Sequence, residues 1–419
     1  MDYAEARDWL FGRRRMGMKY GLERISGLVS DLGSPHLGFR TIHVVGTNGK
    51  GSTTAILAET ARQLGYRTGR MTSPHLLDFR ERIAVDGAWI PEEAVLRFVR
   101  EFRDRIERRE ATFFEIVTAL AAWHFGLEGV DWVIAEAGLG GRYDASRVLA
   151  GEATVFTGVQ IEHSRILGST RPLIAAEKAA IAEPGTLLVA AAQTPDVEEV
   201  IAKAVAEKTL RRILPVEADR GGLPGEHQIR NASLALTAAL ELFIGGPDRI
   251  RRAFEKALDT VRWPGRLDLR RGDPPILFDV AHNPEAVEQL LKHISGWEKP
   301  VPAVVGILSD KPWKEMAALL APHLGPLVTT TPLSERKLDA ADLAAGFREE
   351  GLECHDRERI EDALELCRSM AGGRTVLVTG SFFVVGEAML TAWRRGWIEE
   401  PTGEDSQAIP VDRESAGPV

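Results

Sequence analysis

The stretch Ile42-His43-Val44-Val45-Gly46-Thr47-Asn48-Gly49-Lys50-Gly51-Ser52-Thr53 decides the fold of the first part of the chain. Its apolar start predicts a buried strand over 42–45, and its glycines predict a tight loop before a helix over 53–64. Such a loop turns backbone N–H groups toward phosphate oxygens, while Lys50 adds a cation and the helix its positive N-terminal end. The sequence therefore indicates that ATP or GTP is held by consecutive residues, namely Gly46, Thr47, Asn48, Gly49, Lys50, Gly51, Ser52 and Thr53.

One position differs from the common phosphate-loop pattern. Gly51 stands where Ser or Thr usually follows the lysine, and the hydroxyl moves to Ser52. The loop thus predicts a phosphate site but does not predict a reaction.

Composition narrows the class of protein. The chain has 419 residues, of which 44% are hydrophobic and 27% charged, so we expect a globular protein of two or three domains. Its 52 basic and 61 acidic residues give a net charge of −9, which offers no general surface for nucleic acid or anionic membranes. Cys354 and Cys367 are too few for a disulfide framework, and no apolar run reaches the roughly 20 residues of a membrane helix. We expect a cytoplasmic protein without a nucleic-acid or membrane partner.

Short Val- and Ile-rich runs alternate with helical patterns, which is typical of a parallel sheet covered by helices. The expected strands span 42–45, 67–72, 131–136, 153–159, 187–191, 275–280, 301–307 and 375–379. Further helices are expected over 113–125 and 172–182, and a capping box from Thr112 to Glu115 begins the first of them. The sequence therefore predicts the α/β fold class.

A domain boundary is expected at Arg262-Trp263-Pro264-Gly265-Arg266, where a helical pattern meets proline and glycine. The β-α-β rhythm resumes after it without a second phosphate loop. We therefore predict a nucleotide-binding domain over 1–261, a linker over 262–267, a smaller α/β domain over 268–398 that completes a site between the domains, and a disordered tail over 399–419.

Polar side chains follow three of the expected strands, at Ser73, Glu136 and His163. A hydroxyl or carboxylate at the carboxyl edge of an open α/β sheet can hold magnesium. Each has an ordinary alternative. Ser73-Pro74 is a common turn, Glu136 could pair with Arg142, and a lone histidine is often a hydrogen-bonded structural residue.

Two later segments carry further polar groups. Lys178 lies on the expected helix over 172–182, where a lysine is normally a solvated charge. Asp279-Val280-Ala281-His282-Asn283-Pro284 ends an apolar strand with polar groups that could face a cleft, or that could only cap a helix with proline in its first turn. Because so many polar groups stand at strand ends around one phosphate loop, a shared site is the better interpretation.

Taken together, the ordered motifs resemble the folylpolyglutamate synthase/dihydrofolate synthase family of the Mur ligase superfamily. The resemblance covers roughly residues 17–390 and rests on GTNGKGS, SPH, ERI, FFE, EAGLGGRYDAS, LGST, EKA, HQIRNASLA, WPGR, AHNP and GSFF. It implies an N-terminal P-loop ATPase domain and a smaller C-terminal Rossmann-like domain. It also implies a cytoplasmic, usually monomeric ligase that joins L-glutamate to dihydropteroate or to the γ-carboxylate of folates through an acyl phosphate, with ATP and Mg²⁺.

Carried over by motif, the resemblance also implies roles for single residues in the first domain. Lys50 would contact the β- and γ-phosphates of ATP, and Ser73, Glu136 and His163 would hold magnesium. Lys178 would be carbamylated, so that a cation becomes a carbamate that helps to position the metal.

Other implied roles fall on later motifs and on the substrate side. Asn231, Arg266 and Asp279 match positions that contact the nucleotide, and Asp279 and His282 match a motif that closes on the reacting groups. The motif Phe113-Phe114-Glu115 would shape the substrate side, although capping and packing explain it equally well.

Departures from the family pattern leave two other functions open. Arg147 stands where Asn is common, which adds a charge near the expected metal and substrate region, and Glu162 replaces Asp. A Mur-type ligase for a different carboxylate acceptor is therefore one alternative. The other is a P-loop switch, although no guanine-reading Asn-Lys-x-Asp motif is visible.

Overall fold

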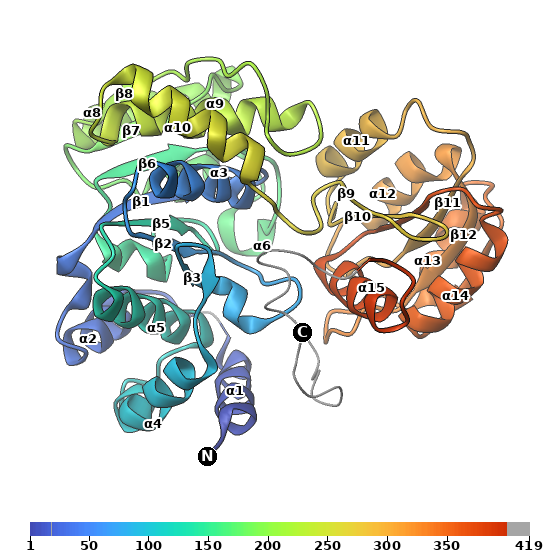
Figure 1. The fold of residues 1–419 in the computed structure, drawn as a ribbon, viewed down its shortest axis with the longest axis horizontal. Coiled ribbons are helices and arrows are strands. Elements are labelled where there is room, and N and C mark those ends of the chain that lie inside the picture. The colour runs from blue at the N-terminus through green and yellow to red at the C-terminus, as the bar shows by residue number, and fades with distance from the viewer. Residues whose placement is uncertain (18, 400–419) are drawn as a thin grey trace. The chain divides into compact units, whose positions relative to one another are not determined.

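The computed structural model describes residues 1–17 and 19–399, and the chain divides into two compact units (Figure 1). The first unit comprises residues 1–74, 80–222 and 228–262. The second comprises 75–79, 223–227 and the chain from Trp263 onward. The sequence did not predict that the two short segments belong with the second unit. The expected disordered tail, beyond Glu399, lies outside the described residues.

An eight-stranded sheet with the order β4-β3-β2-β5-β1-β6-β7-β8 forms the centre of the first unit. Its strands are β1 (Arg40–Val45), β2 (Thr68–Met71), β3 (Ile83–Val85), β4 (Ala88–Trp89), β5 (Trp132–Glu136), β6 (Ala153–Phe156), β7 (Leu187–Ala190) and β8 (Arg211–Ile213). All neighbours from β2 to β8 pair in parallel, whereas β3 and β4 are antiparallel. The carboxyl ends of β2, β5, β1 and β6 therefore lie side by side at one edge.

Helices cover both faces of this sheet. Figure 1 shows α3 and α10 over one face, and α5 with α2 and α4 over the other. The helices of the unit are α1 (Tyr3–Gly12), α2 (Glu23–Asp31), α3 (Lys50–Gln63), α4 (Glu92–Arg108), α5 (Phe113–Glu128), α6 (Ser164–Leu167), α7 (Arg171–Ala179), α8 (Pro195–Lys208), α9 (His227–Leu242) and α10 (Pro247–Thr260). Short 3₁₀ helices are η1 (Arg13–Met16), η2 (Pro35–Gly38), η3 (Phe79–Arg82) and η4 (Ala145–Leu149).

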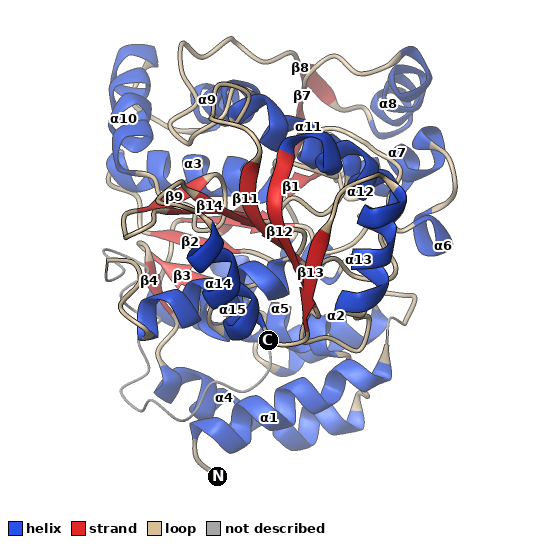
Figure 2. Ribbon diagram, turned by 90° about the vertical axis from the view of Figure 1, so that its right-hand side faces the viewer, coloured by secondary structure: helices blue, strands red, loops and turns tan. Residues whose placement is uncertain are grey.

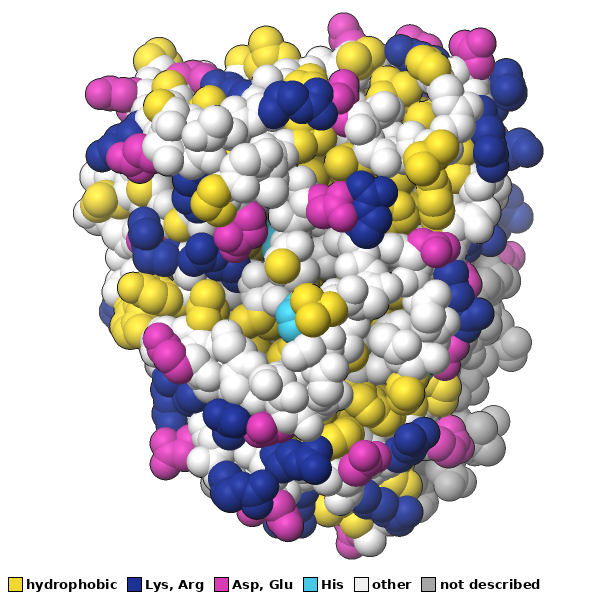
Figure 3. Space-filling model, turned by 90° about the vertical axis from the view of Figure 1, so that its left-hand side faces the viewer, with side chains coloured by type: hydrophobic (Ala, Val, Ile, Leu, Met, Phe, Trp, Pro, Cys, Tyr) yellow, Lys and Arg dark blue, Asp and Glu magenta, His cyan; other side chains and the backbone are white. Residues whose placement is uncertain are grey.

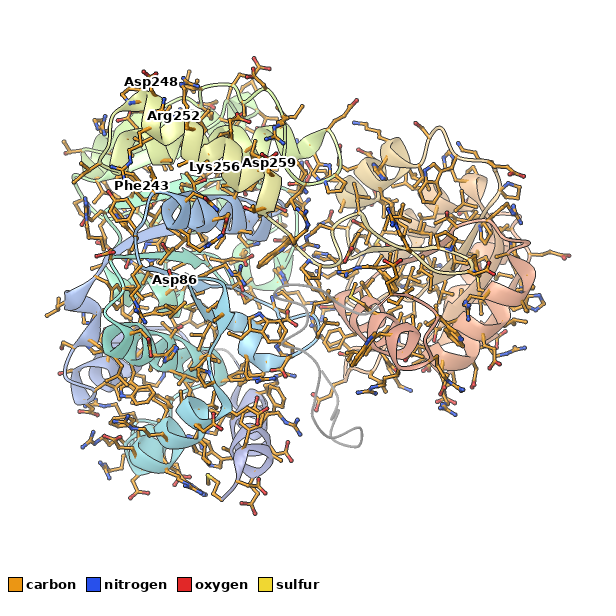
Figure 4. All side chains as sticks on the ribbon, viewed as in Figure 1. Asp86, Phe243, Asp248, Arg252, Lys256 and Asp259 are labelled. Carbon is orange, nitrogen blue, oxygen red and sulfur yellow. The ribbon has the colours of Figure 1, made fainter. Side chains whose placement is uncertain are left out.

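Helix α10 illustrates how apolar spacing orients a helix. Phe254 is buried where α10 packs against α3. The exposed outer side carries charged residues at helical spacing, labelled in Figure 4 as Asp248, Arg252, Lys256 and Asp259. The sequence of the helix therefore places one side against the unit and the other in water.

A two-residue turn closes the small hairpin of β3 and β4. Asp86 and Gly87 both have positive φ, +52° and +86°, as a type I′ turn requires. The Asp86 carboxylate, labelled in Figure 4, also accepts a hydrogen bond of 2.8 Å from the Thr68 N–H. This contact ties the hairpin to β2 at the edge of the sheet.

The second unit has a six-stranded sheet with the order β13-β12-β11-β14-β10-β9, in which only β9 pairs antiparallel. Its strands are β9 (Asp268–Arg270), β10 (Ile276–Asp279), β11 (Val301–Val305), β12 (Leu324–Thr330), β13 (Cys354–Arg357) and β14 (Val376–Thr379). Its helices are α11 (Pro284–His293), α12 (Trp313–Leu320), η5 (Ala321–His323), α13 (Ala340–Glu349), α14 (Ile360–Met370) and α15 (Phe382–Arg394). Figure 2 shows α14 and α15 on one side of this sheet and α12 and α13 on the other, each over its own apolar cluster.

These two sheets confirm the predicted α/β class, and each expected strand is present within a few residues. Strand β12 was not predicted, because Gly325-Pro326 reads as a turn although both residues lie in the strand. Strands β8, β9 and β13 were missed because they are short and partly exposed, and so lack an apolar run. Strands β3 and β4 were not predicted either, since they span only 3 and 2 residues.

The surface and the helices agree with the composition. On the face drawn in Figure 3, acidic and basic side chains are interspersed, without a broad region of one sign. Among the described residues, no helix combines the length and the apolar character that crossing a membrane requires.

Glu115 forms the predicted capping box and anchors α5. Its carboxylate accepts hydrogen bonds of 2.8 Å from the Thr112 N–H and 2.9 Å from the Thr112 hydroxyl, and it lies 3.2 Å from the Arg24 guanidinium. Glu115→Ala should therefore destabilise the first unit by about 1–3 kcal/mol, because a buried donor and a guanidinium lose their acceptor. Urea denaturation measures the loss, with Glu101→Ala in the exposed Arg97–Glu101 pair as the control. Equal midpoints for the two variants would refute the anchoring role.

Candidate active site

The phosphate loop leaves β1 and enters α3 in the way that the sequence predicts. Gly46 and Gly49 have φ of +155° and +84°, a region that disfavours other residues. A Cβ on Gly46 would lie 1.9 Å from Thr157 Oγ1, and a Cβ on Gly49 would lie 2.3 Å from Asn231 Oδ1. The loop backbone is therefore packed tightly on its neighbours, and the fold brings Asn231 of α9 to it.

Lys50 and Thr53 lie on the first turn of α3. Lys50 Nζ donates a hydrogen bond of 2.9 Å to the Thr47 carbonyl, so that its charge stays at the loop. The buried Thr53 hydroxyl has no hydrogen-bond partner among the described residues. A glycine cradle, a cation, a helix N-terminus and an unsatisfied hydroxyl together fit the phosphates of a nucleotide.

Glu136 and Ser73 meet at the ends of the neighbouring strands β5 and β2. The Ser73 N–H donates to Glu136 Oε2 at 3.2 Å, and Glu136 is buried. The alternative partner of Glu136, Arg142, forms its ion pair with Glu177 at 2.8 Å. A buried carboxylate beside a phosphate loop suits a divalent cation that bridges to phosphate oxygens.

His163 follows β6 and begins the short helix α6 with a φ of +49°. The described residues contain no group of three or more His, Cys, Asp or Glu side chains that could hold a metal ion. A site made from Ser73, Glu136 and His163 has only one carboxylate and one imidazole, so its remaining ligands would come from phosphate, water or a modified lysine. The magnesium role of these three residues stays a prediction.

Lys178 is not the solvated helix charge that its position on α7 suggests. Only 3% of its side chain is exposed, and Nζ donates a 2.6 Å hydrogen bond to the carbonyl of Gly46 in the phosphate loop. Glu162 Oε1 lies 3.8 Å from the same atom. Burial, and then the charge of Lys50, lower the pKa of Lys178 to about 7, against the opposing charges of Glu162 and Asp144. An amine of this kind is largely neutral above neutral pH.

In the second unit, Asp279 is buried at the end of β10. Its carboxylate accepts hydrogen bonds of 2.9 Å from the Leu267 N–H and 3.0 Å from the Ala281 N–H. Burial raises the pKa of Asp279 to about 6, although Arg266 and these two hydrogen bonds act in the opposite direction. Asp279 therefore ties the residue just after the end of β10 to the segment that precedes β9.

Two other residues of this motif have distinct contacts: Asn283 caps a helix, and the ring of His282 contacts a backbone carbonyl. Asn283 Oδ1 accepts from the Ala286 N–H at 2.9 Å, which confirms the helix-cap interpretation for this residue. His282 Nδ1 lies 2.9 Å from the Val280 carbonyl, a contact that a neutral ring makes with its proton on Nδ1. The Arg266 guanidinium lies 5.0 Å from the centroid of the Phe382 ring.

One residue at the loop was not singled out from the sequence, and another was noted only as a replacement for Asp. The first is Thr157, whose Oγ1 donates a 2.6 Å hydrogen bond to the Asn48 carbonyl, and the second is Glu162, which faces Lys178. Thr157 directly follows β6, which pairs with β1 in the register Val45 to Phe156. A correct pairing of these two strands would have placed Thr157 beside Gly46, but the sequence alone did not give that pairing.

Comparison with known proteins identifies the family of the chain. Residues 265–382 match the family description "Mur ligase, glutamate ligase domain". A dihydrofolate synthase/folylpolyglutamate synthase of Bacillus subtilis is 32% identical over 92% of this chain and 98% of its own length. The chain belongs to the folylpolyglutamate synthase/dihydrofolate synthase family. A probable bifunctional folylpolyglutamate synthase/dihydropteroate synthase of Haloferax volcanii is 34% identical over 95% of this chain, which spans only 51% of that longer protein.

Solved structures of this family share the whole fold. Mycobacterium tuberculosis folylpolyglutamate synthase complexed with ADP has a TM-score of 0.83 and 30% identity, over 96% of this chain and 99% of that one. A bifunctional folylpolyglutamate synthase/dihydrofolate synthase of Yersinia pestis, complexed with AMPPNP and a Mn ion, has a TM-score of 0.81 and 26% identity, over 94% and 98%. The family thus includes proteins that bind an adenine nucleotide and a divalent metal.

Proposed function

We propose that this protein is an ATP-dependent carboxylate–amine ligase that adds L-glutamate to dihydropteroate, to the γ-carboxylate of reduced folates, or to both. The contact between Lys178 and the phosphate loop carries the proposal, because a plain nucleotide switch has no use for a buried lysine of lowered pKa at this place. Family membership supports the substrates. A cytoplasmic location and a monomeric state belong to the same proposal.

The proposed reaction has two steps. The acceptor carboxylate takes the γ-phosphoryl group of ATP, which gives an acyl phosphate and ADP. The glutamate amino group then attacks the acyl carbon, so that a C–N bond forms, the C–O bond to phosphate breaks, and phosphate and a proton leave. Such chemistry needs positioned charges and exclusion of water more than it needs covalent help from the protein.

Residues of the first unit would supply the positioned charges. The loop N–H groups and Lys50 would hold the β- and γ-phosphates, and Asn231 stands against the loop at Gly49. Glu136, Ser73 and His163 would hold Mg²⁺, with a carbamate on Lys178 as a further anionic group. When bound, the metal supplies positive charge to the phosphoryl oxygens.

In the second unit, the family motif assigns the nucleotide and the reacting groups to Arg266, Asp279 and His282. Asp279 ties the motif, through the Ala281 N–H, to the segment before β9, through the Leu267 N–H, and His282 Nδ1 is fixed at the Val280 carbonyl. We propose that Asp279 acts by positioning the motif and that His282 contacts the reacting groups.

An assay of ADP release tests the proposal. Purified protein is given ATP, Mg²⁺ and glutamate, with dihydropteroate in one series and tetrahydrofolate in another, and glutamate is omitted in the control. We expect release that depends on both the acceptor and glutamate. Absence of release with either acceptor would reject the function, and equal release without acceptor or glutamate would favour a nucleotide switch.

A further inference from the structure

Helix α7, which carries Lys178, is held in place by the loop that follows β5, residues 137–144. The Arg142 N–H donates to the Glu177 carbonyl at 3.0 Å, and Arg142 Nε donates to the Glu177 carboxylate at 2.8 Å. A Cβ on Gly141 would lie only 2.5 Å from the Lys178 carbonyl. The loop backbone therefore touches the very turn of α7 that bears the lysine.

Arg147 connects this loop with the segment after α7. Its Nε donates a 3.0 Å hydrogen bond to Glu183, four residues beyond the last residue of the helix, Ala179. Its Nη1 lies 3.3 Å from the Arg142 carbonyl. Arg147 and Glu183 are only 28% and 30% exposed, so that solvent screens this pair less than a surface pair.

A second cation holds the same segment. Lys208 Nζ, at the end of α8, donates to the carbonyls of Ala180 at 2.8 Å and Ala182 at 2.5 Å. The segment just after α7 is thus held by a donor from α8, and Arg147 joins the same segment, through Glu183, to the loop.

We infer that Arg147 is a positioning residue for Lys178, and that its charge serves this purpose and not the choice of acceptor. It fixes the loop through the Arg142 carbonyl and the end of α7 through Glu183, and these two contacts flank the turn that carries the lysine. The inference rests on the proposed function in that it assigns Lys178 to catalysis.

The position of the Lys178 side chain matters because two groups lie close to its Nζ. Its Nζ sits between the Gly46 carbonyl at 2.6 Å and the Glu162 carboxylate at 3.8 Å. A shift of about 1 Å in a group at the reacting centre can cost roughly 100-fold in rate. Freedom at the end of α7 would therefore appear as lost turnover, whereas the acceptor would still bind.

Arg147→Ala and Glu183→Gln test the inference. Arg109→Ala is the matched control, because its pair with Asp31 has similar exposure and joins the end of α2 to the residue just after α4. We expect kcat to fall by about 10- to 100-fold in both test variants. The KM for each acceptor and the ratio of kcat/KM between dihydropteroate and tetrahydrofolate should stay within about twofold, and Arg147→Lys should recover part of the rate. A changed ratio with unchanged kcat would overturn the inference, as would the same kcat in Arg147→Ala and Arg109→Ala.

A second measurement does not depend on activity. Acetylation of Lys178 by an amine reagent, followed by mass analysis of its peptide, should be slow in the native protein and at least about tenfold faster in Arg147→Ala. Unchanged labelling in a folded Arg147→Ala protein would overturn the positioning role even if no acceptor supported turnover. The two proposals can fail separately. If the native protein is inactive with both acceptors, the proposed function is rejected. If labelling of Lys178 is nevertheless faster in Arg147→Ala, the placement of the lysine by Arg147 still holds.

Discussion

Lys178→Ala lowers ligase turnover by about 100- to 1,000-fold or more, while ATP still binds. The side chain reaches the phosphate loop only through the Gly46 carbonyl, so that its removal leaves the loop N–H groups and Lys50 in place. What is lost is the amine that would carry the carbamate. Steady-state kcat and the Kd of a fluorescent ATP analogue measure the two effects. Lys203→Ala, in the exposed Lys203–Glu207 pair, is the control.

The pH dependence of the native protein follows from the same lysine. Only the neutral amine adds CO₂ to form a carbamate, and the pKa of about 7 keeps the amine mainly neutral above pH 7 and protonated below it. Turnover that needs the carbamate should therefore decline as the pH falls through 7, and bicarbonate should restore part of it. An unmodified Lys178 in fully active enzyme, seen by mass analysis under gentle conditions, would contradict carbamylation.

Much of the fold was predictable because short stretches of sequence determine single strands and helices. The apolar run before Gly46 and the Thr112–Glu115 box each determine their own element, and the structure has both. Strand β12 escaped prediction because its Gly-Pro pair falls where the register with β11 shifts, between the pairs Val301–Leu324 and Ala303–Leu327, and such an irregularity is a property of the sheet.

The candidate site was predictable as residue types at strand ends, but not as contacts. Helical position suggested a solvated Lys178, and only the packing of α7 against the phosphate loop shows it to be buried. Likewise, Arg147 appeared to be a charge for the substrate region, whereas its guanidinium is engaged by Glu183. Such contacts depend on which segments far apart in the chain pack together, and the periodicity of apolar residues in the sequence does not predict that packing.

Lys50→Ala should weaken both nucleotide binding and catalysis, which separates it from Lys178→Ala. Lys50 carries a positive charge within the loop motif and donates to the Thr47 carbonyl, so its removal costs an electrostatic contact with phosphate and a hydrogen bond inside the loop. We expect kcat/KM for ATP to fall by about 1,000-fold, of which roughly tenfold or more appears in the Kd of the ATP analogue. Normal activity in this variant would overturn the assignment of the site.

Lys50 also acts on Lys178 across the loop, and the sign of that effect is testable. The positive charge of Lys50 is one cause of the lowered pKa of Lys178, so that Lys50→Ala should raise that pKa from about 7 toward the ordinary value of 10.5. At pH 7 a larger fraction of Lys178 would then be protonated and unable to take up CO₂. The fraction of carbamylated Lys178, trapped by alkylation and counted by mass analysis, should fall at pH 7 and recover at pH 9. An unchanged fraction at pH 7 would show that burial alone sets the protonation of this lysine and that the two cations work independently.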